Sequence, residues 1–312
     1  MSWQEGMAGD VGAIDITINP WTEIETKGYR HGGDEHFEHK VRMPPEVAAN
    51  GVSMEEYLGM MDRAGVERSL VVAGRCGDMR MKHSSQIAYE QVAEYCETWP
   101  DRYSGLAGVD PATHGVREGV HEMERGIREY GFIGAHIYPH WFGLSPDAAQ
   151  FYPFYYACCE LDVPIMMQVG HCLDYQRDRV LPSVGFPITL ERIAIDFPEL
   201  KIIGIHLGWP WVDELIAMCY KHNNVYMCGD AYAPKHWPAS YVHYINTFGQ
   251  DKVLFGTDWP IYGPERGIGD IEELNLRPEA RRKLYRDNAL ELFKLAGRDS
   301  VTEKSDREAV AS

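Results

Sequence analysis

Short, nearly continuous apolar segments recur along the chain, and each is followed by a stretch with helical spacing. The eight segments cover residues 11–16, 69–74, 103–109, 132–138, 164–169, 201–207, 225–228 and 253–256. Apolar residues that run on without alternating are typical of parallel strands that are covered on both faces. We therefore predict eight parallel β-strands.

The intervening stretches carry helix signals. Ser53-Met-Glu-Glu56 has the form of a capping box, and residues 115–128 and 278–295 space their apolar side chains as a helix does. Strands that alternate with helices in this way favour a closed (β/α)8 barrel, the TIM-barrel form of the α/β class, over an open sheet. We expect a single barrel over residues 1–297 and a disordered tail over residues 298–312.

A long connection, about residues 17–52, separates the first predicted strand from the next strong helix signal. It leaves the carboxyl end of a strand, which is the end where barrel enzymes place their active sites. Connections of this length are commonly functional. We expect this one to form a lid or a wall of a substrate site.

Composition and charge narrow the partners. The chain has 312 residues, of which 45% are hydrophobic, and a formal net charge of −17. Such a charge repels phosphate backbones and anionic bilayers, so we expect neither nucleic acid nor a membrane as a partner. The seven cysteines include no CxxC pair and the first residues show no signal-peptide pattern, which favours a cytoplasmic protein with reduced thiols. We expect a small-molecule substrate and a homodimer or higher homo-oligomer.

Polar residues stand at the ends of several predicted strands. His136 lies in the fourth, His171 follows the fifth, His206 lies in the sixth and Asp258 follows the eighth. Because the carboxyl ends of barrel strands meet on one face, these side chains can converge. His171, His206 and Asp258 form a plausible divalent metal site, with Asp258, His206 and His136 as catalytic candidates. The competing interpretation of each residue alone is a hydrogen-bonded structural histidine or a turn cap.

Aromatic residues gather at or beyond the strand ends and suggest a flat or ring-shaped ligand. Arg75, or Arg30 in the long connection, could bind a substrate carboxylate, although solvation is the more common fate of an arginine. The residues that we expect to bind substrate are Asn19, Arg75, Tyr138, His140, Trp141, Trp209 and Trp259.

Five segments carry a resemblance to a known family: Gly-Phe-Ile-Gly-Ala-His-Ile-Tyr-Pro at 131–139, Val-Gly-His at 169–171, Ile-His-Leu-Gly-Trp-Pro at 205–210, Phe-Gly-Thr-Asp-Trp-Pro at 255–260 and Arg-Asp-Asn-Ala-Leu-Glu-Leu-Phe at 286–293. Over roughly residues 12–297 the chain resembles the amidohydrolase superfamily, in the branch of aminocarboxymuconate-semialdehyde decarboxylase and γ-resorcylate decarboxylase. The resemblance implies one divalent metal, zinc or alternatively manganese. It also implies that His171 is a ligand, that His206 orients or protonates near the metal, and that Asp258 is a ligand and proton acceptor.

The first strand departs from that branch, in which it normally ends Asp-x-His-x-His. Thr17 and Asn19 stand in the two ligand positions, and alternation along the strand predicts that both face the pocket. Uncharged oxygen donors bind zinc far less well than imidazoles. Either His171 and Asp258 hold the metal with a new donor, or there is no metal. The candidate new donors are His136, His140, His31, His36 and His39.

Three functions remain open. The first is a metal-dependent hydrolase for a ring-shaped or aromatic carbonyl or carboxylate compound, in which Asp258 is the base that activates water. The second is a non-oxidative decarboxylase of an aromatic or unsaturated acid, which protonates carbon and uses no attacking water. The third is a barrel that binds a ring-shaped ligand without turnover.

Overall fold

Eight parallel strands form a single sheet in the order β1-β2-β5-β6-β7-β10-β11-β12. The structure is a computed structural model that describes residues 12–28, 35–82, 84–173, 175–176 and 179–295. The strands are β1 (Ala13–Ile18), β2 (Val66–Ala73), β5 (Tyr103–Gly108), β6 (Ala135–Ile137), β7 (Ile165–Gln168), β10 (Ile202–Ile205), β11 (Val225–Cys228) and β12 (Val253–Leu254). Each overlaps one of the eight segments predicted from the apolar pattern.

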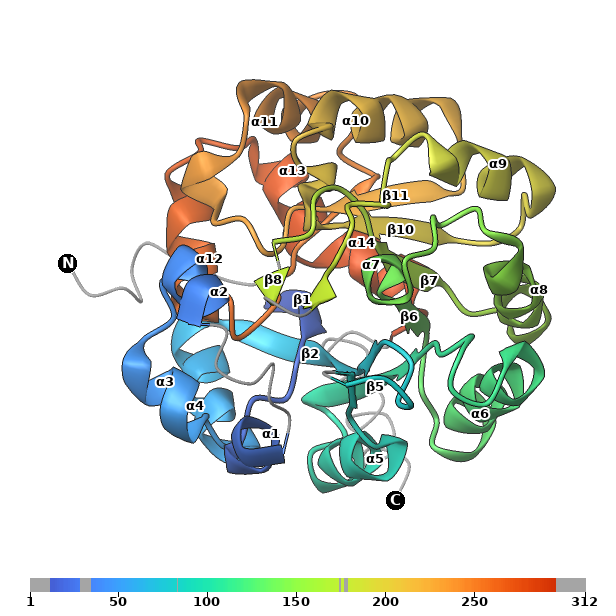
Figure 1. Cartoon of the computed structure of the whole chain (residues 1–312). Helices are drawn as coiled ribbons and strands as arrows, with labels where there is room; N and C mark the ends of the chain where they lie inside the picture. Colours follow the sequence, from blue (N-terminus) through green and yellow to red (C-terminus); the bar gives the residue numbers. More distant parts are fainter. Residues whose placement is uncertain (1–11, 29–34, 83, 174, 177–178, 296–312) are drawn as a thin grey trace, which may run out of the picture.

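Backbone hydrogen bonds close the sheet into a barrel. The Asp258 N–H donates to the Thr17 carbonyl at 2.9 Å, and the Asn19 N–H donates to the Trp259 carbonyl at 2.9 Å. The first strand therefore pairs with the segment that follows the last strand, which closes the ring. The helices surround this ring (Figure 1). The predicted (β/α)8 fold is confirmed.

The helices between the strands lie on the outside of the ring. The longest is α6 (Val116–Glu129), and α4 (Met54–Ala64) opens with the predicted capping box, in which the Ser53 hydroxyl accepts the Glu56 N–H at 3.1 Å. The other helices in the barrel are α5 (Tyr89–Thr98), α7 (Pro139–Phe142), α8 (Tyr152–Leu161), α9 (Thr189–Asp196), α10 (Val212–Lys221), α11 (Ala239–Asn246), α12 (Pro264–Glu272), α13 (Pro278–Arg282) and α14 (Asn288–Leu292).

Apolar packing occurs in two layers. One cluster consists largely of strand residues from around the ring, such as Ile14, Leu106 and Ile203, and the other joins the strands to the helices. This division is expected of a barrel whose strands are covered on both faces. Among the described residues, no helix combines the length and apolar character needed to cross a membrane. The described residues include all seven cysteines, and none of them forms a disulfide bond.

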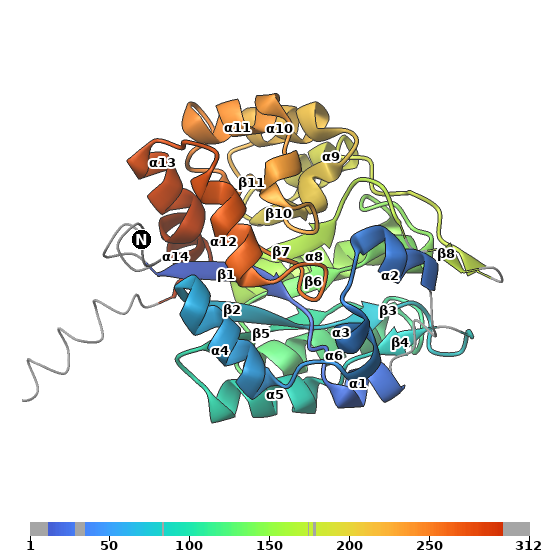
Figure 2. The same cartoon turned by 90° about the vertical axis from the view of Figure 1, so that its left-hand side faces the viewer.

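The long connection after β1 folds into three short helices, α1 (Glu23–Gly28), α2 (Glu35–Val41) and α3 (Pro45–Asn50). Two hydrogen bonds fix it to itself: the Trp21 indole donates to the Val47 carbonyl at 3.0 Å, and the Val52 N–H donates to the Trp21 carbonyl at 2.7 Å. In side view, α2 lies at the same end of the barrel as two small hairpins, β3 (Arg75–Cys76) with β4 (Ser85–Gln86) and β8 (Tyr175–Gln176) with β9 (Arg179–Val180) (Figure 2). The tail predicted at 298–312, Arg30 and His31 lie outside the described residues.

Candidate active site

A cavity of about 150 Å³ opens at the carboxyl end of the barrel. Strand ends form its floor, and the long connection after β1 forms part of its wall, as predicted. Among the described residues that line it, none is lysine or arginine. The lining residues include Asn19, Trp21, Val41, Met43, Tyr138, Trp141, Gln168, His171, His206, Tyr232, Asp258 and Ile261.

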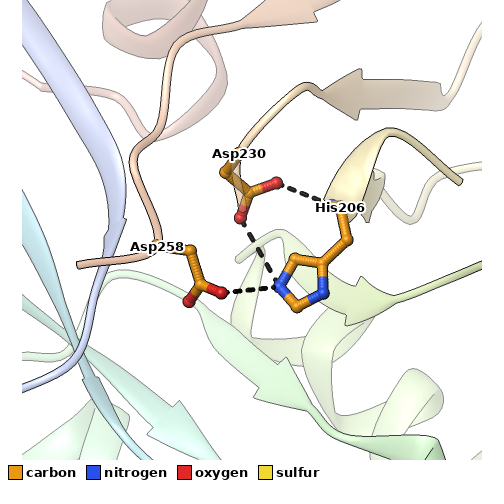
Figure 3. Close-up of side chains that lie close together, drawn as sticks. All are labelled: His206, Asp230 and Asp258. Carbon is orange, nitrogen blue, oxygen red and sulfur yellow. Dashed lines mark hydrogen bonds and ion pairs between the residues drawn. The ribbon is translucent and has the colours of Figure 1, made fainter. Parts of the chain in front are cut away.

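His206, Asp230 and Asp258 meet at the edge of this cavity (Figure 3). His206 Nε2 lies 3.1 Å from Asp258 Oδ2 and 3.8 Å from Asp230 Oδ2. The residues follow β10, β11 and β12, three neighbouring strands, so the barrel itself brings them together. They are 8%, 0% and 6% exposed, respectively.

The backbone at these strand ends is strained. His206 and Asp258 have φ angles of 62° and 53°, and Ala231, next to Asp230, has 62°. Such conformations cost a non-glycine residue about 1–3 kcal/mol and gather at functional sites. The His206 N–H donates to Asp230 Oδ1 at 2.6 Å, so one carboxylate oxygen of Asp230 holds the strained residue in place.

Electrostatics couple the three groups. Burial alone would lower the pKa of His206, but the carboxylates of Asp258 and Asp230 outweigh burial and place that pKa above its ordinary value. Burial raises the pKa of Asp230, and the charge of His206 only partly opposes this effect. The imidazole thus lies beside two carboxyl groups with which it can share a proton.

Asn19 connects the first strand to this cluster. Its amide nitrogen donates to Asp258 Oδ1 at 2.9 Å, and its amide oxygen accepts a hydrogen bond from the Tyr138 hydroxyl at 2.9 Å. Asn19 lines the cavity as predicted, but Thr17 does not. A register shift between Asp15 and Ile18 interrupts the alternation on which the prediction for Thr17 was based.

His171 lies outside the cluster of His206, Asp230 and Asp258, and its predicted role as a metal ligand stays a prediction. It borders the cavity from an exposed position, and its Nδ1 lies 3.0 Å from the Ser183 hydroxyl. Gly170, with φ of 94°, turns the chain just before it, and the His171 N–H bonds to the Trp209 carbonyl at 2.7 Å. At the end of β7 the polar side chain facing the cavity is that of Gln168.

His136 in β6 and His140 in α7 are both buried. His136 is fully buried against the Tyr138 ring, and burial lowers its pKa to about 3. His140 Nε2 lies 3.1 Å from the Gly170 carbonyl, and burial lowers its pKa to about 4. Neither lines the cavity. The catalytic contact predicted for His136 and the substrate contact predicted for His140 stay predictions, and both ring nitrogens of His136 are buried without a hydrogen-bond partner.

Three more predicted substrate contacts lie elsewhere. The Arg75 guanidinium is buried outside the cavity, where it donates to Glu122 Oε1 at 2.7 Å and lies 4.3 Å from the centroid of the Tyr89 ring. Trp259 is buried against Tyr57, with ring centroids 5.2 Å apart. Trp209 is 42% exposed and does not line the cavity. Of the expected substrate-binding residues, Asn19, Tyr138 and Trp141 border the cavity.

Asp230 and Gln168 were missed by the sequence analysis. Gln168 is the last residue of β7, and the rule applied to the histidines would have found it. Asp230 stands two residues beyond the end of β11, within Gly-Asp-Ala, which also resembles an ordinary turn. The cluster that could hold a metal is His206, Asp230 and Asp258. Its donors suit a divalent cation, because His206 Nε2 and Asp230 Oδ2 are buried without a hydrogen-bond partner.

Together the fold and site define a (β/α)8-barrel protein with an imidazole–carboxylate cluster at its strand ends. A family model described as amidohydrolase matches residues 14–295, and the chain belongs to that family. A γ-resorcylate decarboxylase from Polaromonas sp. (strain JS666) is 23% identical over 307 residues, covering 80% of this chain and 90% of the relative. The resemblance stated from the motifs is confirmed.

Solved structures share the same barrel. An uncharacterized TIM-barrel protein from Bordetella bronchiseptica superposes with a TM-score of 0.75 at 23% identity, covering 91% of this chain and 99% of the other. A 5-carboxyvanillate decarboxylase from Novosphingobium aromaticivorans, in complex with manganese and 4-hydroxy-3-methoxy-5-nitrobenzoic acid, gives 0.68 at 19% identity, covering 91% and 96%. At these identities the likeness establishes the fold.

Proposed function

We propose that the protein is a non-oxidative decarboxylase of a single-ring aromatic or unsaturated acid. The observation that carries the proposal is the His206–Asp258 pair, a buried proton-transfer pair bordering a mostly apolar cavity. Decarboxylation needs such a group, because the bond to the carboxyl carbon breaks, carbon dioxide leaves and the ring carbon takes up a proton. Two of the named relatives, the γ-resorcylate decarboxylase and the 5-carboxyvanillate decarboxylase, favour this alternative over the hydrolase that the sequence analysis placed first.

The cavity suits a single ring. Its volume of about 150 Å³ is the size of an apolar protein cavity known to take up benzene. Tyr138 and Trp141 border it and can pack against a flat ligand. An apolar site also favours the reaction, because the negative charge of the carboxylate passes to the ring carbon as neutral carbon dioxide leaves and is then neutralised there by the proton.

A divalent metal, as in the manganese-bound relative, would supply positive charge for an oxygen of the substrate acid. His206, Asp230 and Asp258 are the residues that would hold it. The cavity offers no lysine or arginine among its described lining residues for that purpose. The chain's own contribution is to exclude water with its aromatic wall and to hold the Asp258 carboxyl group beside the cavity for proton transfer.

The test is carbon dioxide release from a panel of single-ring acids, including γ-resorcylate and 5-carboxyvanillate, by protein supplied with Mn²⁺. We expect release from at least one acid. Asp258→Asn should lower the rate by about 10²–10⁴, the usual effect of removing a proton-transfer group.

Asp110→Asn is the matched control, because Asp110 is a buried carboxylate after β5 that caps its own loop and does not line the cavity. It should retain the rate. The proposal fails if the protein hydrolyses ring amides or lactones without releasing carbon dioxide from any acid. Tight binding of ring acids without turnover would instead support the non-catalytic barrel.

A further inference from the structure

The cluster brings two buried carboxyl groups together around one imidazole. No described residue lining the cavity is lysine or arginine. Buried acidic groups are normally paired with a cationic side chain or bound to a metal ion, so this arrangement suits a bound cation.

The positions of the possible ligand atoms also favour a bound cation. His206 Nε2 lies within hydrogen-bond distance of Asp258 Oδ2, yet its geometry gives it no hydrogen-bond partner. Asp230 Oδ2 is fully buried and also has no partner, while Oδ1 of the same side chain accepts the His206 N–H. Two lone-pair donors thus face one another with neither satisfied. This geometry fits atoms that share an ion better than it fits a hydrogen-bonded pair.

The first strand does not contribute a donor. Both polar atoms of Asn19 are used, since its nitrogen donates to Asp258 and the Trp259 carbonyl and its oxygen accepts from Tyr138. Thr17 is buried away from the cavity. His171 lies outside the cluster, with its Nδ1 beside Ser183.

We infer that this chain binds one divalent cation through His206, Asp230 and Asp258, a ligand set on three adjacent strands in which Asp230 takes the place of the first-strand histidines. Two carboxylates and a neutral imidazole balance the charge of one such ion. Oxygen-rich donors of this kind suit Mn²⁺, and three protein donors leave room for a substrate oxygen. The catalytic meaning of this ion rests on the proposed decarboxylation, but its binding does not.

The test is a titration of chelator-treated protein with MnCl2, in which the electron paramagnetic resonance signal of free Mn²⁺ gives the dissociation constant without any substrate. We expect one ion per chain in the wild type. Asp230→Asn should weaken binding by more than about 100-fold, because changes outside the ligand shell alone cost about 10–100-fold. The asparagine keeps the oxygen that accepts the His206 N–H. This variant therefore removes the carboxylate ligand of the metal and preserves the hydrogen bond to the His206 backbone.

Two control variants separate this ligand set from the one that the family resemblance implied. His171→Asn and Asp110→Asn should bind Mn²⁺ as the wild type does. His206→Gln provides a second ligand variant should Asp230→Asn fail to fold, which circular dichroism would reveal. Wild-type protein that binds no Mn²⁺, undiminished binding by Asp230→Asn, or loss of binding in His171→Asn would each overturn the inference.

The two proposals fail separately. Mn²⁺ binding as described, with no carbon dioxide released from any acid, would defeat the decarboxylase and leave the metal site standing. Carbon dioxide release that persists at the wild-type rate in chelator-treated Asp230→Asn would defeat the metal site and leave the decarboxylase standing.

Discussion

Asn19 is the residue through which the first strand acts on the site. Its amide donates to the Asp258 carboxylate, and the Tyr138 hydroxyl fixes the amide in turn. A hydrogen bond to a charged group contributes about 1.5–3 kcal/mol, more than one between neutral groups. Asn19 therefore orients Asp258 toward His206, and the amide replaces an imidazole as an orienting group rather than as a ligand.

A pair of variants tests this role. Asn19→Ala should lower kcat by about 10- to 100-fold, which corresponds to the loss of that hydrogen bond. Tyr138→Phe removes only the outer hydrogen bond and should lower kcat by less than tenfold. Steady-state kinetics on the preferred acid give both values. If Tyr138→Phe lowers kcat more than Asn19→Ala does, the tyrosine acts on the substrate directly and not through Asn19 and Asp258.

At the scale of the elements, Asp15 joins the first strand to the segment that follows the last one. Its buried carboxylate accepts hydrogen bonds from the Thr257 hydroxyl at 2.6 Å and from the Thr257 N–H at 3.0 Å. Burial raises the pKa of Asp15 to about 7, and the hydrogen bonds from Thr257 and Thr17 reduce this effect only in part. The seam of the barrel thus depends on an acid that folding makes harder to ionise.

The raised pKa of Asp15 gives a signed pH dependence. The folded chain holds this proton more tightly than the unfolded chain, so the stability that the protonated acid provides is lost as pH rises from about 4 to about 7. Between pH of about 5.5 and about 8, wild type should lose more than about 1.4 kcal/mol relative to Asp15→Asn, which cannot ionise. Urea unfolding of both proteins at each pH measures the difference. A difference that does not change with pH would mean that Asp15 is ionised throughout.

Arg75 lies in the β3–β4 hairpin, where its hydrogen-bond partners are other residues of the chain. It is buried, and besides Glu122 it bonds the Ile87 carbonyl, which follows β4. Arg75→Met should lower the free energy of unfolding by about 1.5–3 kcal/mol through the loss of these charged hydrogen bonds. KM for the acid substrate should stay within twofold of wild type. A large rise in KM with unchanged stability would restore the carboxylate-binding role that the sequence suggested.

At the scale of the whole molecule, the apolar segments determine the barrel. Strands buried on both faces leave a strong pattern, so the apolar segments alone predict the positions of all eight. Strand ends were a weaker guide to the site. They identified His206 and Asp258, but a single glycine turn carries His171 out of the cluster, and no periodicity signals such a turn.

Asp230 is a site residue that the strand-end pattern does not identify. It lies beyond its strand, where a polar residue usually marks a turn, and only the closed ring places it against His206. Local patterns specify which segments become strands. The convergence of side chains from neighbouring strands depends on how each chain turns after its strand ends, and that depends on contacts made between strands. Alternation failed at Thr17 for a related reason, because a register shift is a property of the paired strands.

We propose that the cluster delivers a proton to the carbon atom that has lost its carboxyl group. The most direct measurement is turnover of the preferred acid in D2O, with the product examined by proton NMR and the released carbon dioxide counted. We expect one deuterium at the former carboxyl carbon for each carbon dioxide released, and no oxygen from labelled water in the product. A product that carries solvent oxygen, or a substrate consumed without carbon dioxide, would contradict the account.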